Sequence, residues 1–228
     1  MISNLLFNFI FFIALATVFS GLLFGYFCEK YTVTVEPKLE SSLSASKMAR
    51  MDSQQLLNEL RENPIDPNSF ARADKARVKH IHLTWNVDFE TKIISGSSIF
   101  TVERMEFGAD RLNLDTVDLT INSVNYLSLN GTTVNKVSIP FVVHISVEDF
   151  GSKLEIDISS IDAMEFQVEV VYQNSPNSRA LQWLTPEQTD GKRVPFMFSQ
   201  CQAINARSLL PCQDTPSVKA TYTATVRF

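Results

Sequence analysis

The stretch Lys79-His-Ile-His-Leu-Thr-Trp-Asn-Val-Asp-Phe89 decides the fold class of this chain. Apolar residues occupy every second position, and polar residues fill the positions between them. Successive side chains of a strand point to opposite faces of a sheet, so this alternation predicts a half-buried β-strand with one face on a core. Residues 90–92 are expected to form a turn, and the same period over residues 94–102 predicts a second strand.

The same alternation recurs along the rest of the chain. Further strands are expected at residues 112–114, 121–129, 141–147, 154–158 and 166–172. The dipeptide Asn130-Gly131 is the strongest two-residue hairpin signal, and Phe150-Gly151-Ser152 marks another turn. So many short strands at this spacing predict an all-β fold, an antiparallel-rich β-sandwich or saddle, in a domain over residues 67–228.

Composition limits the classes of partner. The 228 residues are 45% hydrophobic and carry a net charge of −5, which is typical of a globular chain. No cluster of Lys and Arg is present to bind phosphates, so nucleic acid is not expected as a partner. The three cysteines form neither a disulfide framework nor a zinc-binding spacing.

The N-terminus has the composition of a membrane segment. No Asp, Glu, Lys or Arg occurs from residue 2 to residue 28, and about 20 apolar residues suffice to cross a bilayer as a helix. We expect residues 1–28 to be an uncleaved transmembrane signal-anchor. The competing interpretation is a cleaved signal peptide, with small residues near Gly21 as the cleavage site.

The flanking charges predict an orientation for this segment. Lys30, Lys38 and Lys47 follow the apolar run, and the positive-inside tendency then keeps the β-domain on the cytosolic side. The glycosylation sequon that begins at Asn130 points the other way if it is used, but its Asn-Gly pair is better explained as a hairpin turn. We therefore expect a single-pass membrane protein with a cytosolic β-domain.

Residues 29–66 have the composition of a stalk or linker. A polar, serine-rich stretch covers residues 41–46. A short helix is expected to begin at Asp52 or Ser53 and to end at Arg61, before Pro64. At the other end, the chain stops inside an alternating strand pattern over residues 220–228, so we expect a C-terminally truncated domain.

Three long motifs are more specific. They are Ala-Leu-Gln-Trp-Leu-Thr-Pro-Glu-Gln-Thr at 180–189, Phe-Ser-Gln-Cys-Gln-Ala-Ile-Asn at 198–205 and Leu-Pro-Cys-Gln-Asp-Thr-Pro-Ser-Val-Lys at 210–219. Together with residues 79–83 and 114–121, they resemble the N-terminal β-domain of the leukotriene A(4) hydrolase family of zinc aminopeptidases. The resemblance covers residues 66–228. It implies a large enzyme that removes N-terminal residues from peptides, with epoxide hydrolysis in some members.

The resemblance also implies zinc as the cofactor of the full-length family. Its catalytic domain holds zinc through a His-Glu-x-x-His motif, in which two imidazoles share one helix face. The only histidines here are His80, His82 and His144, and that motif does not occur. We therefore expect no metal ligands, no catalytic residues and no turnover in this chain alone. His80 and His82 share one strand face, but two ligands are a weak metal signal.

One functional element is implied by the resemblance. The segment that matches Gln200, Cys201, Gln202 and Ala203 reaches the active-site cleft in the family and contacts the free amino end of a peptide. A carboxamide offers both donors and an acceptor, so it can orient a peptide terminus without adding charge. The alternative is a buried strand end whose amides satisfy nearby backbone groups. Asn205 stands where the family commonly has His, which leaves the substrate preference open.

These observations lead to one functional expectation and one rival. The chain is expected to supply one wall of a peptide cleft and a docking face for a catalytic domain that it lacks. Its expected partners are a peptide substrate, that catalytic domain, and a membrane through residues 2–28. The rival is a non-catalytic, membrane-tethered β-module that binds peptides or a partner protein.

Overall fold

The computed structural model describes residues 49–130 and 133–228. The expected anchor at residues 1–28 and the serine-rich part of the expected stalk lie outside these described residues. Within them, no helix is both long enough and apolar enough to cross a bilayer.

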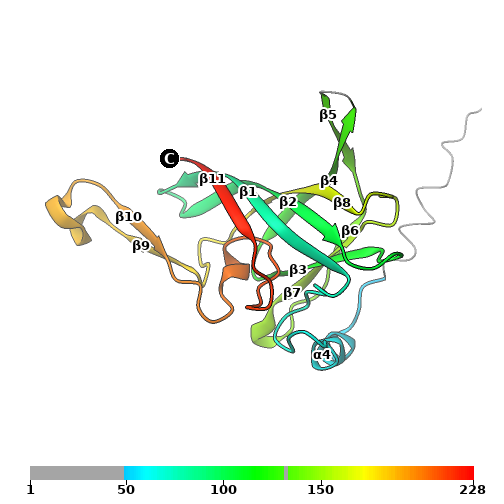
Figure 1. Ribbon diagram of the computed structural model, residues 1–228. Coiled ribbons are helices and arrows are strands. Elements are labelled where there is room, and N and C mark those ends of the chain that lie inside the picture. Colours follow the sequence, from blue (N-terminus) through cyan, green and yellow to red (C-terminus); the bar gives the residue numbers. More distant parts are fainter. Residues whose placement is uncertain (1–48, 131–132) are drawn as a thin grey trace, which may run out of the picture. The chain divides into compact units, whose positions relative to one another are not determined.

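The described chain is mostly β, as the alternation predicted (Figure 1). The strands are β1 (Ala76–Asp88), β2 (Ile93–Arg104), β3 (Arg111–Thr116), β4 (Thr120–Asn130), β5 (Thr133–Ser138), β6 (Phe141–Val143), β7 (Ser152–Asp157), β8 (Glu165–Gln173), β9 (Leu181–Leu184), β10 (Phe196–Ser199) and β11 (Thr221–Arg227). The helices are α4 (Ser53–Arg61) and the 3-10 turns η1 (Glu148–Phe150), η2 (Pro186–Gln188), η3 (Asp190–Lys192) and η4 (Ala206–Ser208).

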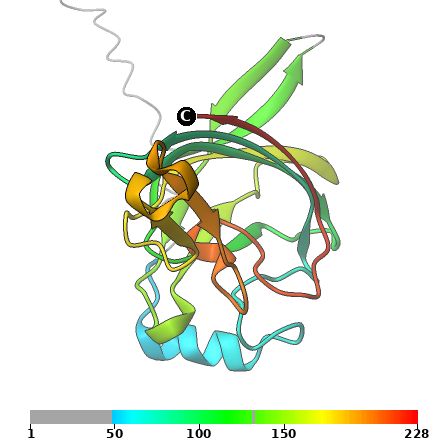
Figure 2. The same ribbon diagram turned by 90° about the vertical axis from the view of Figure 1, so that its left-hand side faces the viewer.

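The strands form three sheets. The largest has the order β11-β1-β2-β8-β4-β5, a second has the order β3-β7-β6, and β9 pairs with β10 alone. Every pair is antiparallel except β1 with β11, which are parallel. Strands β4 and β5 pair on either side of residues 131–132, where the sequence predicted a hairpin. Figure 2 shows the curvature of the large sheet.

The main core lies between the six-stranded and the three-stranded sheet. Phe100 and Val168 of the large sheet are fully buried, as are Leu114 and Ile156 of the small one, and all belong to one cluster. Each of these residues belongs to the apolar set of a period-two pattern in its strand, so that pattern correctly identified the faces that meet. The all-β prediction is confirmed.

The short helix predicted between residue 52 or 53 and residue 61 is α4. The Asp52 side chain accepts a hydrogen bond from the Gln55 backbone N–H, and the Gln55 side chain accepts one from the Asp52 N–H. This reciprocal capping box satisfies two backbone donors that a helix start leaves free. Leu56 and Leu60 are buried against Phe70, so the apolar face of α4 packs on the β-domain.

Candidate functional site

An open groove of about 830 Å³ lies along β1 and β11. Its floor is the inner face of β1 and β11, with Ile81, Leu83 and Ala224 among its apolar residues. Its opposite side is formed by the segment that follows β10. A groove of this size, with an apolar floor and a few polar groups at its edge, has the general character of a ligand site.

The β9–β10 ribbon leads into one edge of the groove through Ser199, the last residue of β10. It projects from the body of the domain in Figure 1 and is anchored at its base, where the rings of Phe89 and Trp183 meet edge to face with centroids 5.4 Å apart. β10 ends at Ser199, and the backbone N–H of Gln200 donates to the Ala180 carbonyl over 2.8 Å. The chain therefore leaves the ribbon at a fixed point and runs along the groove.

The structure brings three of the four predicted site residues to the groove. Cys201, Gln202 and Ala203 line it, whereas Gln200 is exposed beside it and does not line it. Gln202 and Ala203 are exposed, and Cys201 is half-buried. The amide-bearing segment therefore lies on the surface of the domain.

The two glutamines differ in their hydrogen bonding. The Oε1 atom of Gln200 accepts a hydrogen bond from the backbone N–H of Gln202 over 3.1 Å. Within the part of the chain that the structure describes, the Gln202 carboxamide makes no hydrogen bond to the protein. Gln202 therefore keeps a donor and an acceptor available to a ligand, while Gln200 uses its acceptor inside the loop.

The two cysteines near the groove are unsuited to nucleophilic chemistry. Both thiols are free. Burial raises the pKa of Cys212 well above its ordinary value, and the nearby carboxylates of Asp214 and Asp115 raise it further. Burial and Asp214 also raise the pKa of Cys201. Because the thiolate is the reactive form of cysteine, both groups stay protonated and unreactive at neutral pH.

The described residues do not fit a zinc site. His80 and His82 lie on β1 and direct their Nδ1 atoms to the hydroxyls of Thr221 and Thr223, at 2.7 and 2.8 Å. His144 is buried elsewhere, and its Nδ1 accepts the backbone N–H of Met51. Across residues 49–130 and 133–228, no three His, Cys, Asp or Glu side chains gather around a common point.

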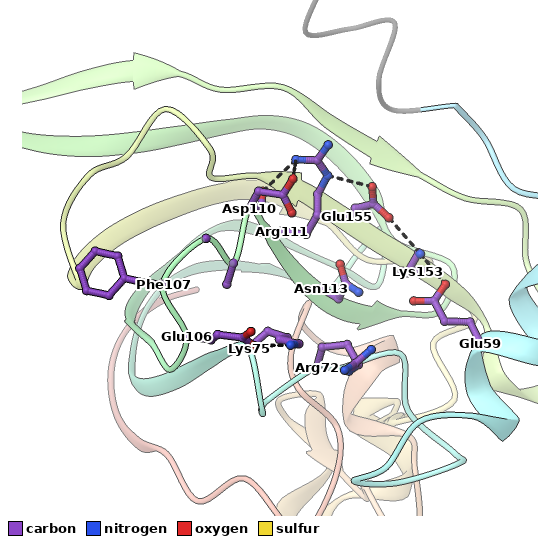
Figure 3. Close-up of a pocket in the computed structure, with 12 residues that line it drawn as sticks. Glu59, Arg72, Lys75, Glu106, Phe107, Asp110, Arg111, Asn113, Lys153 and Glu155 are labelled. Carbon is purple, nitrogen blue, oxygen red and sulfur yellow. Dashed lines mark hydrogen bonds and ion pairs between the residues drawn. The ribbon is translucent and has the colours of Figure 1, made fainter.

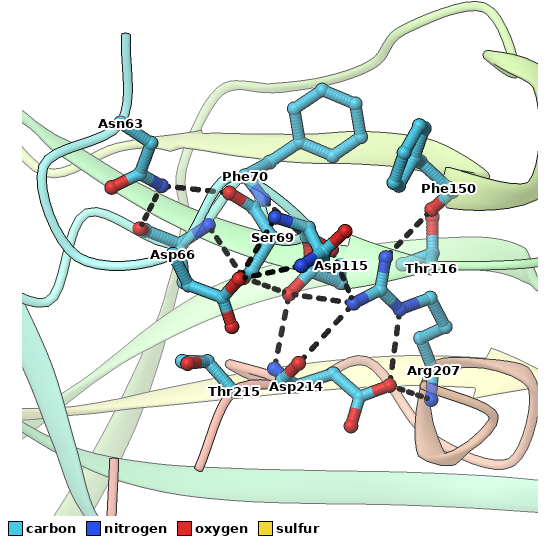
Figure 4. A network of polar contacts seen from close by, with 12 residues as sticks. Asn63, Asp66, Ser69, Phe70, Asp115, Thr116, Phe150, Arg207, Asp214 and Thr215 are labelled. Carbon is cyan, nitrogen blue, oxygen red and sulfur yellow. Dashed lines mark hydrogen bonds and ion pairs between the residues drawn. The ribbon is translucent and has the colours of Figure 1, made fainter. Parts of the chain in front are cut away.

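A buried ionic network behind the groove was not foreseen from the sequence. The Arg207 side chain is fully buried, and its Nε donates to Asp214 over 3.0 Å (Figure 4). Its terminal nitrogens donate to the carbonyls of Phe150 and Asn68 at 2.8 and 2.9 Å. Asp115, also fully buried, lies 3.8 Å from the guanidinium. Burial raises the pKa of Asp115, although Arg207 opposes that shift.

A second cavity, of about 330 Å³, is lined by charged residues of both signs (Figure 3). The Nζ atom of Lys153 lies 2.6 Å from Glu59 and 2.9 Å from Glu155, and Arg111 contacts Glu155 over 3.2 Å. These charges satisfy one another and join α4 to β7. This cavity is therefore a weaker candidate for a binding site than the groove.

Comparison with known proteins identifies relatives over the same part of the chain. The sequence is 44% identical over 159 residues to leukotriene A-4 hydrolase of Xenopus laevis, covering 69% of this chain and 25% of that protein. It is 39% identical over 161 residues to leucine aminopeptidase 2 of Neurospora crassa, covering 69% of this chain and 23% of that protein. The chain thus spans about a quarter of the length of these relatives.

Solved structures agree with the sequence comparison. The native yeast LTA4 hydrolase superimposes with a TM-score of 0.63 at 32% identity, covering 78% of this chain and 27% of that chain. The yeast LTA4 hydrolase in complex with bestatin superimposes with a TM-score of 0.62 at 33% identity. The β-fold described above is therefore that of the N-terminal part of these enzymes, as the three motifs indicated.

The predicted single-pass membrane location is contradicted by these relatives, which are a leukotriene A-4 hydrolase and leucine aminopeptidases. The prediction rested on the length of the charge-free apolar run and on the lysines that follow it. A long run without charges is necessary for a membrane-spanning helix but does not demonstrate one. The single-pass membrane location is therefore wrong, and the expected membrane partner falls with it.

The family of this chain is identified by a sequence match over one domain. Residues 77–228 match the peptidase M1 N-terminal domain, a range that begins at the second residue of β1 and includes the groove and the Arg207, Asp214 and Asp115 side chains of the ionic network. The match covers well over half of the chain, and the relatives and solved structures agree with it. This chain belongs to the peptidase M1 N-terminal domain family.

Proposed function

We propose that the β-domain over residues 67–228 forms one wall of the substrate cleft of a zinc aminopeptidase of the leukotriene A(4) hydrolase kind. Gln200, Cys201, Gln202 and Ala203 are its peptide-binding residues. The observation that carries this proposal is the exposure of Gln202 and Ala203 at the edge of the 830 Å³ groove. The yeast relative in complex with bestatin is consistent with a cleft of this kind.

The role of this chain is binding and orientation. The free oxygen of the Gln202 carboxamide can accept a hydrogen bond from the ammonium of a peptide N-terminus, and its NH₂ can donate to a carbonyl. Zinc and the group that activates water belong to another part of the full-length enzyme. That enzyme would remove N-terminal residues from peptides and, in the hydrolase members, open an epoxide.

A docking face for the catalytic part is the second element of the proposal. Large apolar side chains are exposed on the β9–β10 ribbon and on β11, among them Phe196, Phe198 and Tyr222. The rings of Phe196 and Phe198 stack with centroids 6.3 Å apart, and contiguous exposed apolar surface commonly marks a protein contact. We place the catalytic domain of the full-length enzyme on this surface.

The binding role is tested by titrating the 228-residue chain with the tripeptide Leu-Gly-Gly and with its N-acetylated form, observed by NMR. The free peptide should shift the amide signals of residues 200–203, and acetylation should weaken binding because it removes the ammonium. Gln202→Ala should weaken binding about fivefold, as expected for one hydrogen bond. Gln182→Ala, an exposed glutamine on the neighbouring strand β9, is the matched control and should bind as the wild type does.

Two results would overturn the proposal. One is equal affinity of the wild type and Gln202→Ala for the free peptide. The other is peptide hydrolysis by this chain with added zinc that a chelator abolishes, because we propose that the chain alone has no turnover.

A further inference from the structure

The loop over residues 200–205 has both of its ends tied to one residue, Ala180. At its start, the Gln200 backbone N–H donates to the Ala180 carbonyl over 2.8 Å. At its end, the Ser208 hydroxyl accepts the Ala180 N–H at 3.0 Å and donates to the Asn205 carbonyl at 2.8 Å. Ser208 is buried, so this hydroxyl is shielded from competing water. The loop is therefore closed at its base.

Arg207, in the turn η4 that follows the loop, also fixes its base. Its backbone N–H donates to the Asp214 carboxylate over 3.2 Å, in addition to the contacts of its guanidinium (Figure 4). The partners of Arg207 come from segments 57 and 139 positions away in the sequence. Since several distant segments hold η4, the C-terminal end of the loop is fixed to a well-held support.

Above this support, two side chains hold the backbone of Gln202. Gln200 accepts from its N–H over 3.1 Å, and the Nδ2 of Asn205 donates to its carbonyl oxygen over 3.1 Å. Only the nitrogen of the Asn205 amide can donate to a carbonyl, so the orientation of this side chain is fixed by chemistry. Both backbone polar groups of Gln202 are thus occupied, and only its carboxamide is left free.

We propose that Asn205 is a positioning residue for the peptide site: it fixes the Gln202 backbone so that the Gln202 carboxamide and Ala203 face the groove before a peptide arrives. This inference rests on the proposed peptide-binding function. A loop that is ordered in advance loses less conformational entropy on binding, which strengthens affinity without any new contact to the ligand. Asn205 acts through Gln202 and does not line the groove itself.

The test uses two substitutions at Asn205 in the 228-residue chain, with Leu-Gly-Gly as the probe. Asn205→Ala removes the donor and should weaken peptide binding about fivefold, the usual effect of one hydrogen bond. Asn205→Asp removes the donor and adds a negative charge, which by itself would attract the peptide ammonium. If Asn205 is a positioning residue, both variants should bind the peptide more weakly. If its role is purely electrostatic, Asn205→Asp should bind the peptide more tightly.

Asn177→Ala and Asn177→Asp are the matched controls, because Asn177 is an exposed asparagine in a separate turn. They should leave peptide affinity unchanged. The second readout is hydrogen exchange of the Gln202 backbone N–H, which should become faster in Asn205→Ala and stay unchanged in Asn177→Ala. Wild-type exchange and wild-type affinity in Asn205→Ala would overturn the inference, and so would tighter binding by Asn205→Asp.

The two proposals fail in different ways. If the wild-type chain binds no peptide, the proposed function fails, and the exchange rate of the Gln202 N–H still decides whether Asn205 holds the loop. If the wild type binds and Gln202→Ala weakens binding while Asn205→Ala does not, only the positioning role of Asn205 is wrong.

Discussion

The Nζ atom of Lys153 on β7 lies 2.6 Å from a carboxylate oxygen of Glu59 on α4, 94 positions earlier in the chain. The Lys153 side chain is only 3% exposed, so this ion pair is shielded from water. Lys75 lines the same cavity, but it pairs with Glu106 at the exposed rim (Figure 3). The cavity therefore holds one buried and one exposed lysine for direct comparison.

Lys153→Ala should lower the free energy of unfolding by about 3 kcal/mol, because it leaves Glu155 and Glu59 without their buried cation. Lys75→Ala should lower it by less than about 1 kcal/mol, since solvent screens an exposed pair. Urea unfolding followed by circular dichroism measures both values. Equal losses for the two variants would show that the burial of Lys153 contributes nothing.

Stability should fall in acid through Glu155. Burial raises the pKa of its carboxyl, but the His144 ring 3.5 Å away and the Lys153 ammonium outweigh burial and bring the pKa from 4.5 to about 2. A carboxyl with a lowered pKa in the folded state stabilises the protein above its unfolded pKa, and this stability is lost as pH falls from 4.5 towards 2. Unfolding free energies measured across that window should decline less steeply in Glu155→Gln than in the wild type.

Helix α4 should contribute to the stability of the β-domain. Leu56 is fully buried in the cluster with Phe70 and Val147, so Leu56→Ala should cost about 2–4 kcal/mol through lost burial and the cavity left behind. Gln54→Ala, at an exposed position of the same helix, should change stability by less than about 0.5 kcal/mol. Thermal melts that are superimposable for wild type and Leu56→Ala would show that α4 folds apart from the domain.

Two glycines with positive φ should respond differently to alanine. Gly151 has a φ of 79°, and a Cβ there would lie 2.3 Å from the Thr116 carbonyl oxygen. Gly108 has a φ of 87°, but a Cβ there meets nothing within 4 Å. Gly108→Ala should cost about 1 kcal/mol of backbone strain, and Gly151→Ala should cost clearly more because β3 must also move. Calorimetric melting of both variants compares the two costs.

Local patterns in the sequence were enough to predict much of the fold. The alternation at Ile81, Leu83 and Trp85 correctly identified β1 and its apolar face, because successive side chains of a strand point to opposite faces of the sheet. The capping residue Asp52 correctly marked the start of α4. What covers the apolar face of α4 could not be predicted, since Phe70 and Val147 lie in other elements whose placement is a property of the whole fold.

For the candidate site too, the sequence predicted local features but not contacts between distant segments. The motif around Gln202 indicated a surface loop near a cleft, and the structure places Gln202 at the groove. The network of Arg207 was missed because its partners lie up to 139 positions away. One local signal was present: Arg207 stands within a mostly apolar run from residue 203 to residue 211, where an isolated charge needs a buried partner.

The parallel pairing of β1 with β11 has a consequence for the order of events during synthesis. His80 meets Thr221 across an interval of 141 positions, so β1 lacks its outer neighbour until nearly the whole domain has been translated. At about 5–20 residues per second, that interval lasts roughly 7–28 s. Throughout it, the nascent polypeptide presents the edge of β1 from His80 to Asn86 unpaired to the ribosome surface and to chaperones.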